Sequence, residues 1–281
     1  MSDQWLMEQL HPYYRKALHF TEKLVDEQSQ FQHIEVYQTD YFGKVLVLDG
    51  IIQLTELDNP GYHEMIVHVP LMALAGARAE GPKRVLIVGG GDGGSLQQVL
   101  RYPSIEEAVV CELDERVVAV SRQHFTAFGD PWSDPRAKLV IQDAFEYLKA
   151  QTGSFDAIIS DTTDPIGMAA RLFSEEFYWL MWQALTPGGA ITTQCEQMFF
   201  DAGLIKDIYQ FVQKMARNPA YYHALIPTYP GGGIGFMYVS DTPWNEGLKA
   251  PYPPGQSNYI NADVHRAAFA LPEFFRRQLF S

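Results

Sequence analysis

Two aspartates that directly follow a predicted strand are the residues of this chain best suited to chemistry. Asp161 and Asp164 come after the apolar run FDAIIS, in the segment Asp161-Thr162-Thr163-Asp164-Pro165. Ligands of open α/β sheets bind beyond the carboxyl ends of the strands, and two carboxylates there suit a general base and an anchor for a cation. The alternative is an Asx-type turn, in which the side chains bond only to nearby backbone.

A glycine-rich loop follows an earlier apolar run, KRVLIVGG. Its residues 89–94, GGGDGG, contain the pattern G-x-G-x-x-G, which lets backbone N–H groups approach a ligand at the start of a helix. A tight turn without a ligand is the alternative. Asp92 lies inside this loop, where a carboxylate repels the pyrophosphate of a dinucleotide and attracts an ammonium group. The loop therefore favours a ligand that carries positive charge.

Two further acids end the next two predicted strands. Glu112 lies 18 residues after Gly94, where an acid accepts hydrogen bonds from the hydroxyls of a ribose. Asp143, which precedes Ala144, is placed to accept from the exocyclic amine of adenine. Each acid has an alternative as the N-cap of the next helix, a role that Asp114 fits better than Glu112 does. These acids indicate a nucleoside but do not distinguish NAD from S-adenosylmethionine.

Alternating strand and helix patterns from about residue 83 place these acids at one edge of a sheet. Five β-α units run from KRVLIVGG to GGAITTQCE, and two strand patterns in succession, YHALIPTY and GIGFMYVS, follow them. This order predicts a doubly wound α/β fold with a mostly parallel, seven-stranded, Rossmann-like sheet of the kind found in S-adenosylmethionine enzymes. Residues 59–281 are expected to form this catalytic domain.

The first 58 residues have a different pattern. They contain four short strand-like runs, LHFTEKLVDE, FQHIEVYQTD, KVLVL and IIQLTEL. Asp49-Gly50, between the last two runs, is a strong hairpin signal, since both residues tolerate the positive φ that the turn requires. Residues 1–58 are therefore predicted to form a small antiparallel β domain.

Composition limits the class of partner. The 281 residues include 21 Lys and Arg against 34 Asp and Glu, a net charge of −13. Such a surface repels nucleic acids and anionic membranes and suits a small cationic substrate. Two cysteines, Cys111 and Cys195, are too few for a disulfide framework and fit a cytoplasmic protein. We expect no signal peptide, no membrane helix and no protein-bound metal.

Several segments together resemble the polyamine aminopropyltransferases, the spermidine synthase family. They are GGGDGG, CELDERVV, IQDAFEYL, DTTDPIG, IPTYP and NADVHRAAFALPE, with VLVLDGIIQLTE and YHEM nearer the N-terminus. The resemblance implies transfer of the aminopropyl group of decarboxylated S-adenosylmethionine to an amine, usually putrescine, giving spermidine and 5′-methylthioadenosine. It implies a homodimer, with a tetramer as the alternative. It also implies that the donor is a co-substrate and that no cofactor takes part.

The resemblance also implies roles for eleven residues. The donor would be held by Gln32, Gln53, Asp92, Glu112, Asp143 and Ala144. The acceptor would lie against Tyr62, His63, Asp92, Asp161, Asp164 and Tyr229. Asp161 would accept the proton of the amine, and the acids together would offset the repulsion between two cationic substrates. For Tyr62 and Tyr229, packing in the core is the alternative to contact with an alkylammonium chain.

Three segments depart from the family pattern. Residues 167–173 read GMAARLF where the family usually has GPAESLF, so Met168 replaces a proline beside the nucleoside and Arg171 belongs to a pair that replaces an acid-bearing one. Gln194-Cys195-Glu196 stands where the family often has Gln-Gly-Glu, and residues 58–61, DNPG, replace a more acidic and aromatic run. Because these changes surround the acceptor, agmatine, cadaverine and spermidine stay open as alternatives to putrescine.

Two other functions share most of these features. A methyltransferase that uses ordinary S-adenosylmethionine would have the same sheet, the same glycine loop, and acids at positions such as Glu112 and Asp143. A polyamine-binding protein without activity would share the fold as well. The presence of both Asp161 and Asp164 argues against that last possibility, since a protein that only binds does not need a proton acceptor.

Overall fold

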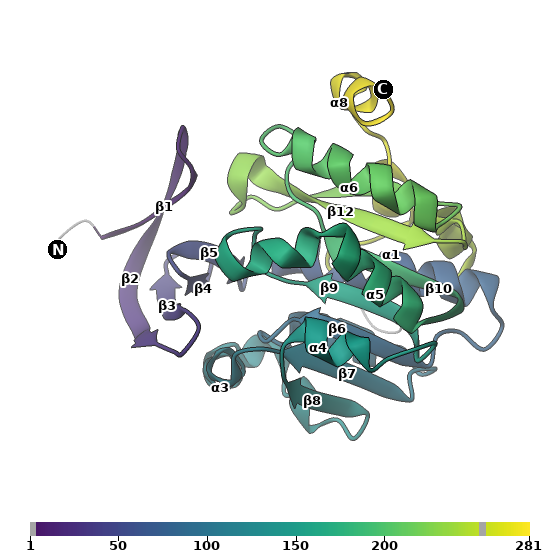
Figure 1. Cartoon of the computed structure of the whole chain (residues 1–281). Coiled ribbons are helices and arrows are strands. Elements are labelled where there is room, and N and C mark those ends of the chain that lie inside the picture. Colours follow the sequence, from purple (N-terminus) through teal and green to yellow (C-terminus); the bar gives the residue numbers. More distant parts are fainter. Residues whose placement is uncertain (1–3, 253–256) are drawn as a thin grey trace.

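The computed structural model describes residues 4–252 and 257–281 and contains two sheets that lie side by side (Figure 1). The smaller sheet has five antiparallel strands in sequential order. They are β1 (Trp5–His11), β2 (Tyr14–Gln28), β3 (His33–Thr39), β4 (Lys44–Leu48) and β5 (Ile51–Thr55). Asp49 and Gly50 join β4 to β5 with φ angles of 49° and 81°, which confirms the predicted hairpin.

The strand β1 was not predicted from the sequence. Its residues alternate in exposure, with Trp5 and Met7 outside and Leu6 and Glu8 buried. An acid at an inward-facing position and large apolar side chains at outward-facing ones hide the usual period of a half-buried strand. The predicted sheet therefore begins one strand too late, and the omission matters because Glu8 belongs to the cavity described below.

The larger sheet confirms the predicted doubly wound α/β fold. It has seven strands in the order β11-β12-β10-β9-β6-β7-β8, and β12 is antiparallel to both of its neighbours while the five strands from β10 to β8 run parallel. The strands are β6 (Arg84–Gly89), β7 (Glu107–Glu112), β8 (Ala137–Ile141), β9 (Phe155–Asp161), β10 (Leu185–Gln194), β11 (Ala220–Leu225) and β12 (Gly233–Ser240). Gly89 pairs with Asp161 in the β6–β9 register, so the glycine loop and the first aspartate leave the sheet together.

Helices cover both faces of this sheet. The helices α4, α5 and α6 lie together on one face, and α1 crosses behind the sheet (Figure 1). The α-helices are α1 (Asn59–Ala77), α2 (Gly94–Leu100), α3 (Glu115–His124), α4 (Ala144–Lys149), α5 (Glu175–Ala184), α6 (Ala202–Met215), α7 (Ala262–Ala268) and α8 (Glu273–Leu279). The short 3₁₀ turns are η1 (Thr126–Phe128), η2 (Pro131–Ser133), η3 (Gly167–Phe173), η4 (Pro230–Gly232) and η5 (Trp244–Lys249).

The helix α1 was also not predicted. It is buried from Gly61 to Leu74 without a polar face, so the sequence lacks the periodic contrast that marks an amphipathic helix. It packs against the larger sheet and brings Tyr62 and His63 to the carboxyl ends of the strands. No helix among the described residues is long and apolar enough to cross a membrane.

The smaller sheet makes apolar contacts with α3 and with the short turn that follows it. Ile34, Leu46 and Leu54 of the smaller sheet pack in one cluster with Val117 of α3 and with Phe128. Burial of this cluster holds the strands β3 to β5 against the start of α3. The division of the chain at residue 58 into two domains stays a prediction.

A single buried carboxylate fastens the C-terminal segment to α1. Glu64 is buried, and its two oxygens accept the backbone N–H groups of Asn258, Tyr259 and Ile260 at 2.8, 3.0 and 2.8 Å. Three donors depend on this one side chain. Because an unpaired buried donor costs about 1–3 kcal/mol, the loss of Glu64 should weaken the fold rather than the chemistry.

We therefore expect Glu64→Ala to lower the free energy of unfolding by about 2–3 kcal/mol, because three backbone N–H groups, of which that of Ile260 is buried, lose their acceptor. Urea denaturation followed by circular dichroism measures this value. Glu80→Ala is the matched control: Glu80 is exposed and its contact is an ion pair with Lys83, so about 0.5 kcal/mol or less is expected. Equal values for both variants would contradict the anchoring role.

Candidate active site

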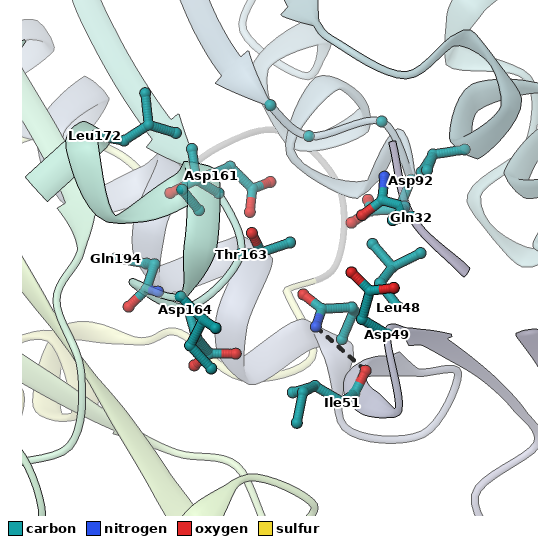
Figure 2. A pocket seen from close by; sticks show the side chains of 18 of the residues that line it. Gln32, Leu48, Asp49, Ile51, Asp92, Asp161, Thr163, Asp164, Leu172 and Gln194 are labelled. Carbon is teal, nitrogen blue, oxygen red and sulfur yellow. Dashed lines mark hydrogen bonds between the residues drawn. The ribbon is translucent and has the colours of Figure 1, made fainter. Parts of the chain in front are cut away.

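One cavity of about 570 Å³ lies between the carboxyl ends of the parallel strands and the smaller sheet. All eleven residues that the resemblance assigned to the two substrates line it. Figure 2 shows Asp161 on one side of the cavity and Gln32 and Asp49 across from it. The structure thus brings together side chains from the smaller sheet, from α1 and from the ends of β6, β7 and β9, whereas their individual roles stay predictions.

Asp161 is held at the end of β9 by hydrogen bonds on both carboxylate oxygens. The Tyr62 hydroxyl donates to Oδ1 at 2.8 Å and the Ser95 hydroxyl donates to Oδ2 at 2.6 Å. Burial, assisted by the nearby charge of Asp92, raises the pKa of Asp161 to about 6. The side chain makes contacts with other elements rather than with its own turn, which favours the base over the turn former that was its alternative.

The glycine loop packs too closely for side chains. Gly89 has φ +73°, and a Cβ there would lie 2.2 Å from the backbone oxygen of Asp161. A Cβ on Gly94 would lie 2.1 Å from the ring of His63. The loop also donates the Gly90 N–H to the Asp161 carbonyl at 2.8 Å. These contacts explain the glycines sterically and fix the loop against the proposed base and against α1.

Asp92 and His63 form an ion pair inside the cavity. His63 Nε2 lies 3.4 Å from Asp92 Oδ1, and the Gly94 N–H donates to the same oxygen at 2.5 Å. Burial alone would raise the pKa of Asp92 and lower that of His63. Their mutual attraction outweighs burial, so the pKa of Asp92 lies below and that of His63 above its ordinary value. His63, which the resemblance assigned to the acceptor, therefore also contacts the residue expected to hold the donor ammonium.

The two acids that are expected to contact the nucleoside, Glu112 and Asp143, each precede a helix. Asp114 caps α3 by accepting from Arg116 N–H at 3.0 Å, as expected, and leaves Glu112 to project into the cavity. Burial raises the pKa of Glu112 to about 7. Asp143 caps α4 by accepting from Phe145 N–H at 2.8 Å. The N-cap alternative thus holds for Asp143, and its contact with adenine stays a prediction.

Two glutamines that the resemblance assigned to the donor line the cavity from the side of the smaller sheet. The Gln32 amide donates to Asp114 Oδ2 at 3.0 Å, which links the loop after β2 to the cap of α3. The Gln53 amide donates to the Ile51 carbonyl at 3.2 Å, the dashed contact in Figure 2. Arg171, one of the departures from the family pattern, forms an ion pair with Asp143 at 2.8 Å. The unusual segment η3 is therefore bound to the acid that is expected at the adenine.

The other end of the cavity is acidic. Burial and the charge of Glu8 raise the pKa of Asp164 to about 6. Glu196 is buried with a φ of 51°, and its pKa lies well above the ordinary value because of burial and the charge of Asp164. The Tyr229 hydroxyl donates to the Gln53 carbonyl. This accumulation of buried acids favours a bound cation, which would restore their charge.

Several lining or contacting residues were missed by sequence analysis. Glu8 was missed because β1 was missed, and Asp201 lies at the start of α6 without any motif. Ser95 follows the glycine loop directly, and a hydroxyl at the start of a helix is too common to single out.

Two groups of residues have the spacing of metal ligands within the described parts of the chain. They are His63, Asp92 and Asp161, and Asp26, His33 and Glu35, each with ligand atoms within 4.8 Å of one another. Asp161 already accepts two hydrogen bonds, Asp92 is paired with His63, and Lys23 lies between Asp26 and Glu35 at 2.7 and 2.6 Å. Both groups are thus internally paired, and we assign no metal to either.

Comparison with known proteins agrees with this arrangement. The chain matches the Spermine/spermidine synthase domain over residues 59–247 and the Spermidine synthase tetramerisation domain over residues 4–56. It is 40% identical over 268 residues to the spermidine synthase of Dictyostelium discoideum, which covers 94% of this chain and 92% of that protein. It is 36% identical over 274 residues to the polyamine aminopropyltransferase of Leptospira biflexa, with 96% of each chain covered.

A solved structure extends the comparison to three dimensions. A spermidine synthase in complex with the transition state analogue AdoDATO superposes with a TM-score of 0.93 at 33% identity, over 100% of this chain and 96% of that one. The fold and the matches together define an aminopropyltransferase. The chain belongs to the spermine/spermidine synthase family. This assignment confirms the resemblance and favours aminopropyl transfer over methyl transfer and over binding without catalysis.

The contacts of Asp161 predict how activity depends on pH. Hydrogen bonds to a carboxylate favour its charged form and so lower its pKa. Tyr62→Phe removes one of them and should move the acid limb of the kcat/KM profile from near pH 6 upward by about one pH unit. Tyr178→Phe is the control, because its buried hydroxyl bonds Thr193 instead. An acid limb that stays in place in Tyr62→Phe would show that Asp161 is not the titrating group.

Proposed function

We propose that this enzyme transfers the aminopropyl group of decarboxylated S-adenosylmethionine to putrescine, giving spermidine and 5′-methylthioadenosine. The observation that carries the proposal is Asp161, a buried carboxylate fixed by Tyr62 and Ser95 in a cavity with acids at both ends. Membership of the family supports the type of reaction. The similar structure in complex with a transition state analogue supports a small-molecule substrate.

The chemistry requires a proton acceptor. Alkylammonium groups have pKa values near about 10, so the acceptor is protonated at pH 7. Asp161, with a pKa of about 6, is ionised at that pH and takes one proton. The freed nitrogen lone pair attacks the methylene carbon next to the sulfonium; a C–N bond forms, the C–S bond breaks, and its electron pair returns to sulfur as a neutral thioether. Positioning and charge stabilisation supply the rest of the catalysis.

Putrescine is proposed because a second carboxylate stands at a suitable position. Asp164 lies three residues after Asp161 on the same turn, so one acid faces the reacting amine and the other the distal ammonium. Agmatine is the main rival, since its guanidinium binds a carboxylate through two hydrogen bonds. The matched family covers both spermidine and spermine synthases, so membership alone does not select the acceptor.

An acceptor panel tests the proposal directly. The purified chain is given decarboxylated donor with putrescine, cadaverine, agmatine or spermidine, and the products are identified by mass. Putrescine should have the highest kcat/KM, and Asp161→Asn should lower kcat about 10²-fold or more with little change in donor binding. A higher kcat/KM for agmatine or spermidine would overturn the choice of putrescine, and an unimpaired Asp161→Asn would overturn the base.

The second test concerns the donor. The carboxylate of ordinary S-adenosylmethionine would sit near Asp92, where like charges at about 4 Å cost roughly 4 kcal/mol at an effective dielectric of 20. Because His63 offsets part of this repulsion, we expect the decarboxylated donor to bind about 10²–10³-fold more tightly in calorimetry. Asp92→Asn should reduce the ratio of the two donor affinities.

The exposed Asp263, at the start of α7, supplies the control variant Asp263→Asn, whose donor ratio should equal that of the wild type. Equal affinity of the wild-type protein for the two donors would contradict the role of Asp92. An unchanged ratio in Asp92→Asn would assign the discrimination to another group.

We propose further that the chain is a homodimer or a homotetramer. The match to a tetramerisation domain over residues 4–56 supports this, as do Trp5 and Met7, whose side chains are 49% and 57% exposed on the outer face of β1. Apolar side chains in such a row suit a second copy of the chain. We propose in addition that neither a metal nor a cofactor takes part, because the chemistry above needs only the two substrates. A cytoplasmic location stays a prediction, and it agrees with two free, buried cysteines.

A further inference from the structure

A lysine stands at the acidic end of a cavity that takes cations. Lys16 of β2 has a side chain that is only 12% exposed, and its ammonium lies 2.9 Å from Glu8 Oε1, where the glutamate side chain is 1% exposed. The same ammonium donates to the Thr228 carbonyl and lies 5.7 Å from the centre of the Tyr229 ring. Glu8 and Tyr229 both line the cavity. Lys16 is therefore in contact with the acceptor end without being part of the chemistry.

The contacts of Lys16 are those that a bound alkylammonium would make. A carboxylate, a carbonyl and an aromatic face are the partners expected for an amine of the substrate. Here the protein provides the cation itself. Glu8 has its second oxygen on the Ile52 N–H at 2.7 Å, so its carboxylate is already satisfied on both sides. The charge of Glu8 is therefore neutralised by a side chain of the protein, which, unlike a substrate amine, does not dissociate.

The remaining acids keep the site attractive to one distal cation. Asp164, Glu196 and Asp201 lie at this end of the cavity, and burial raises the pKa of each of them. A single ammonium near Asp164 would therefore be stabilised. A further cationic centre that reached Glu8 would meet the Lys16 ammonium instead of a free carboxylate, and like charges repel.

We propose that Lys16 is a specificity-determining residue that pairs with Glu8 and so restricts the acceptor to an amine with one distal cation, such as a diamine. Acceptors with a third cationic centre, such as the triamine spermidine, are disfavoured. This inference rests on the proposed function and deepens it. If the ion pair only stabilised the fold, its removal would change kcat/KM equally for all acceptors.

The test compares the kcat/KM values of two acceptors within each variant. Formation of 5′-methylthioadenosine is followed with spermidine and with putrescine, and the ratio of their kcat/KM values is the readout. Lys16→Met keeps the length and removes the charge, which exposes Glu8. We expect the spermidine-to-putrescine ratio to rise about tenfold or more. Lys16→Arg keeps the charge and should leave the ratio within about twofold of the wild type.

Two further variants isolate the charge from the fold. Glu8→Gln leaves Lys16 unbalanced and should lower the ratio, and Glu8→Gln with Lys16→Met removes both charges and should return the ratio towards the wild type. Comparison of Glu8→Gln with this double variant tests the effect of the charge even if Lys16→Met alone does not fold. Lys23→Met is the matched control, because Lys23 lies on the same strand and pairs with Asp26 and Glu35, outside the cavity lining.

The outcomes separate this inference from the proposed function. A wild-type chain that transfers no aminopropyl group to any amine would overturn the function. A chain that does so, but whose spermidine-to-putrescine ratio is the same in the wild type and in Lys16→Met, would overturn the role of Lys16 alone. Equal losses for both acceptors in Lys16→Met and Lys16→Arg would assign the ion pair to structure.

Discussion

The burial of the Asp161 carboxylate is the constraint on which the rest of this structure depends. A carboxylate removed from water is stable only when its oxygens have partners. Tyr62 of α1 and Ser95 of α2 supply them, so two helices must meet at the end of β9. The glycine loop, which has no room for a Cβ beside Asp161, follows from the same crowding. Burial also raises the pKa of Asp161 to about 6. A general base is most effective when its pKa lies near the working pH.

The charges of the cavity are balanced in pairs, with acids left over. His63 pairs with Asp92 beside the glycine loop, and Lys16 pairs with Glu8 at the far end. Asp161 and Asp164 lie between these pairs without a cation of their own among the described ion pairs. Binding of the two cationic substrates that we propose requires such excess negative charge, yet each uncompensated buried acid destabilises the empty site. Internal pairing limits that cost and leaves the acids where the substrates complete the balance.

Much of this arrangement follows from local patterns in the sequence. Apolar runs such as KRVLIVGG, each followed by a helical pattern, are typical of a parallel sheet buried on both faces, and strands of such a sheet end at a common edge. These patterns alone therefore predict a shared site for Asp92, Glu112, Asp143 and Asp161, and all four residues line the cavity. The turn at Asp49-Gly50 was equally local, since its backbone conformation selects its residue types.

The tertiary structure decided what the local pattern does not contain. The sequence by itself determined the sheet, the glycine loop and the family, because these depend on periodicity and on motifs within short segments. It did not reveal α1, whose buried residues show no periodic alternation of apolar and polar side chains. It also did not reveal β1, in which the inward-facing Glu8 is of a residue type typical of a surface. Lys16 has the sequence context of an exposed lysine, and only folding brings it against Glu8, Thr228 and Tyr229. Lys16 and Thr228 are 212 residues apart in the chain. Their contact therefore depends on the packing of distant segments, which the pattern of a single segment does not predict.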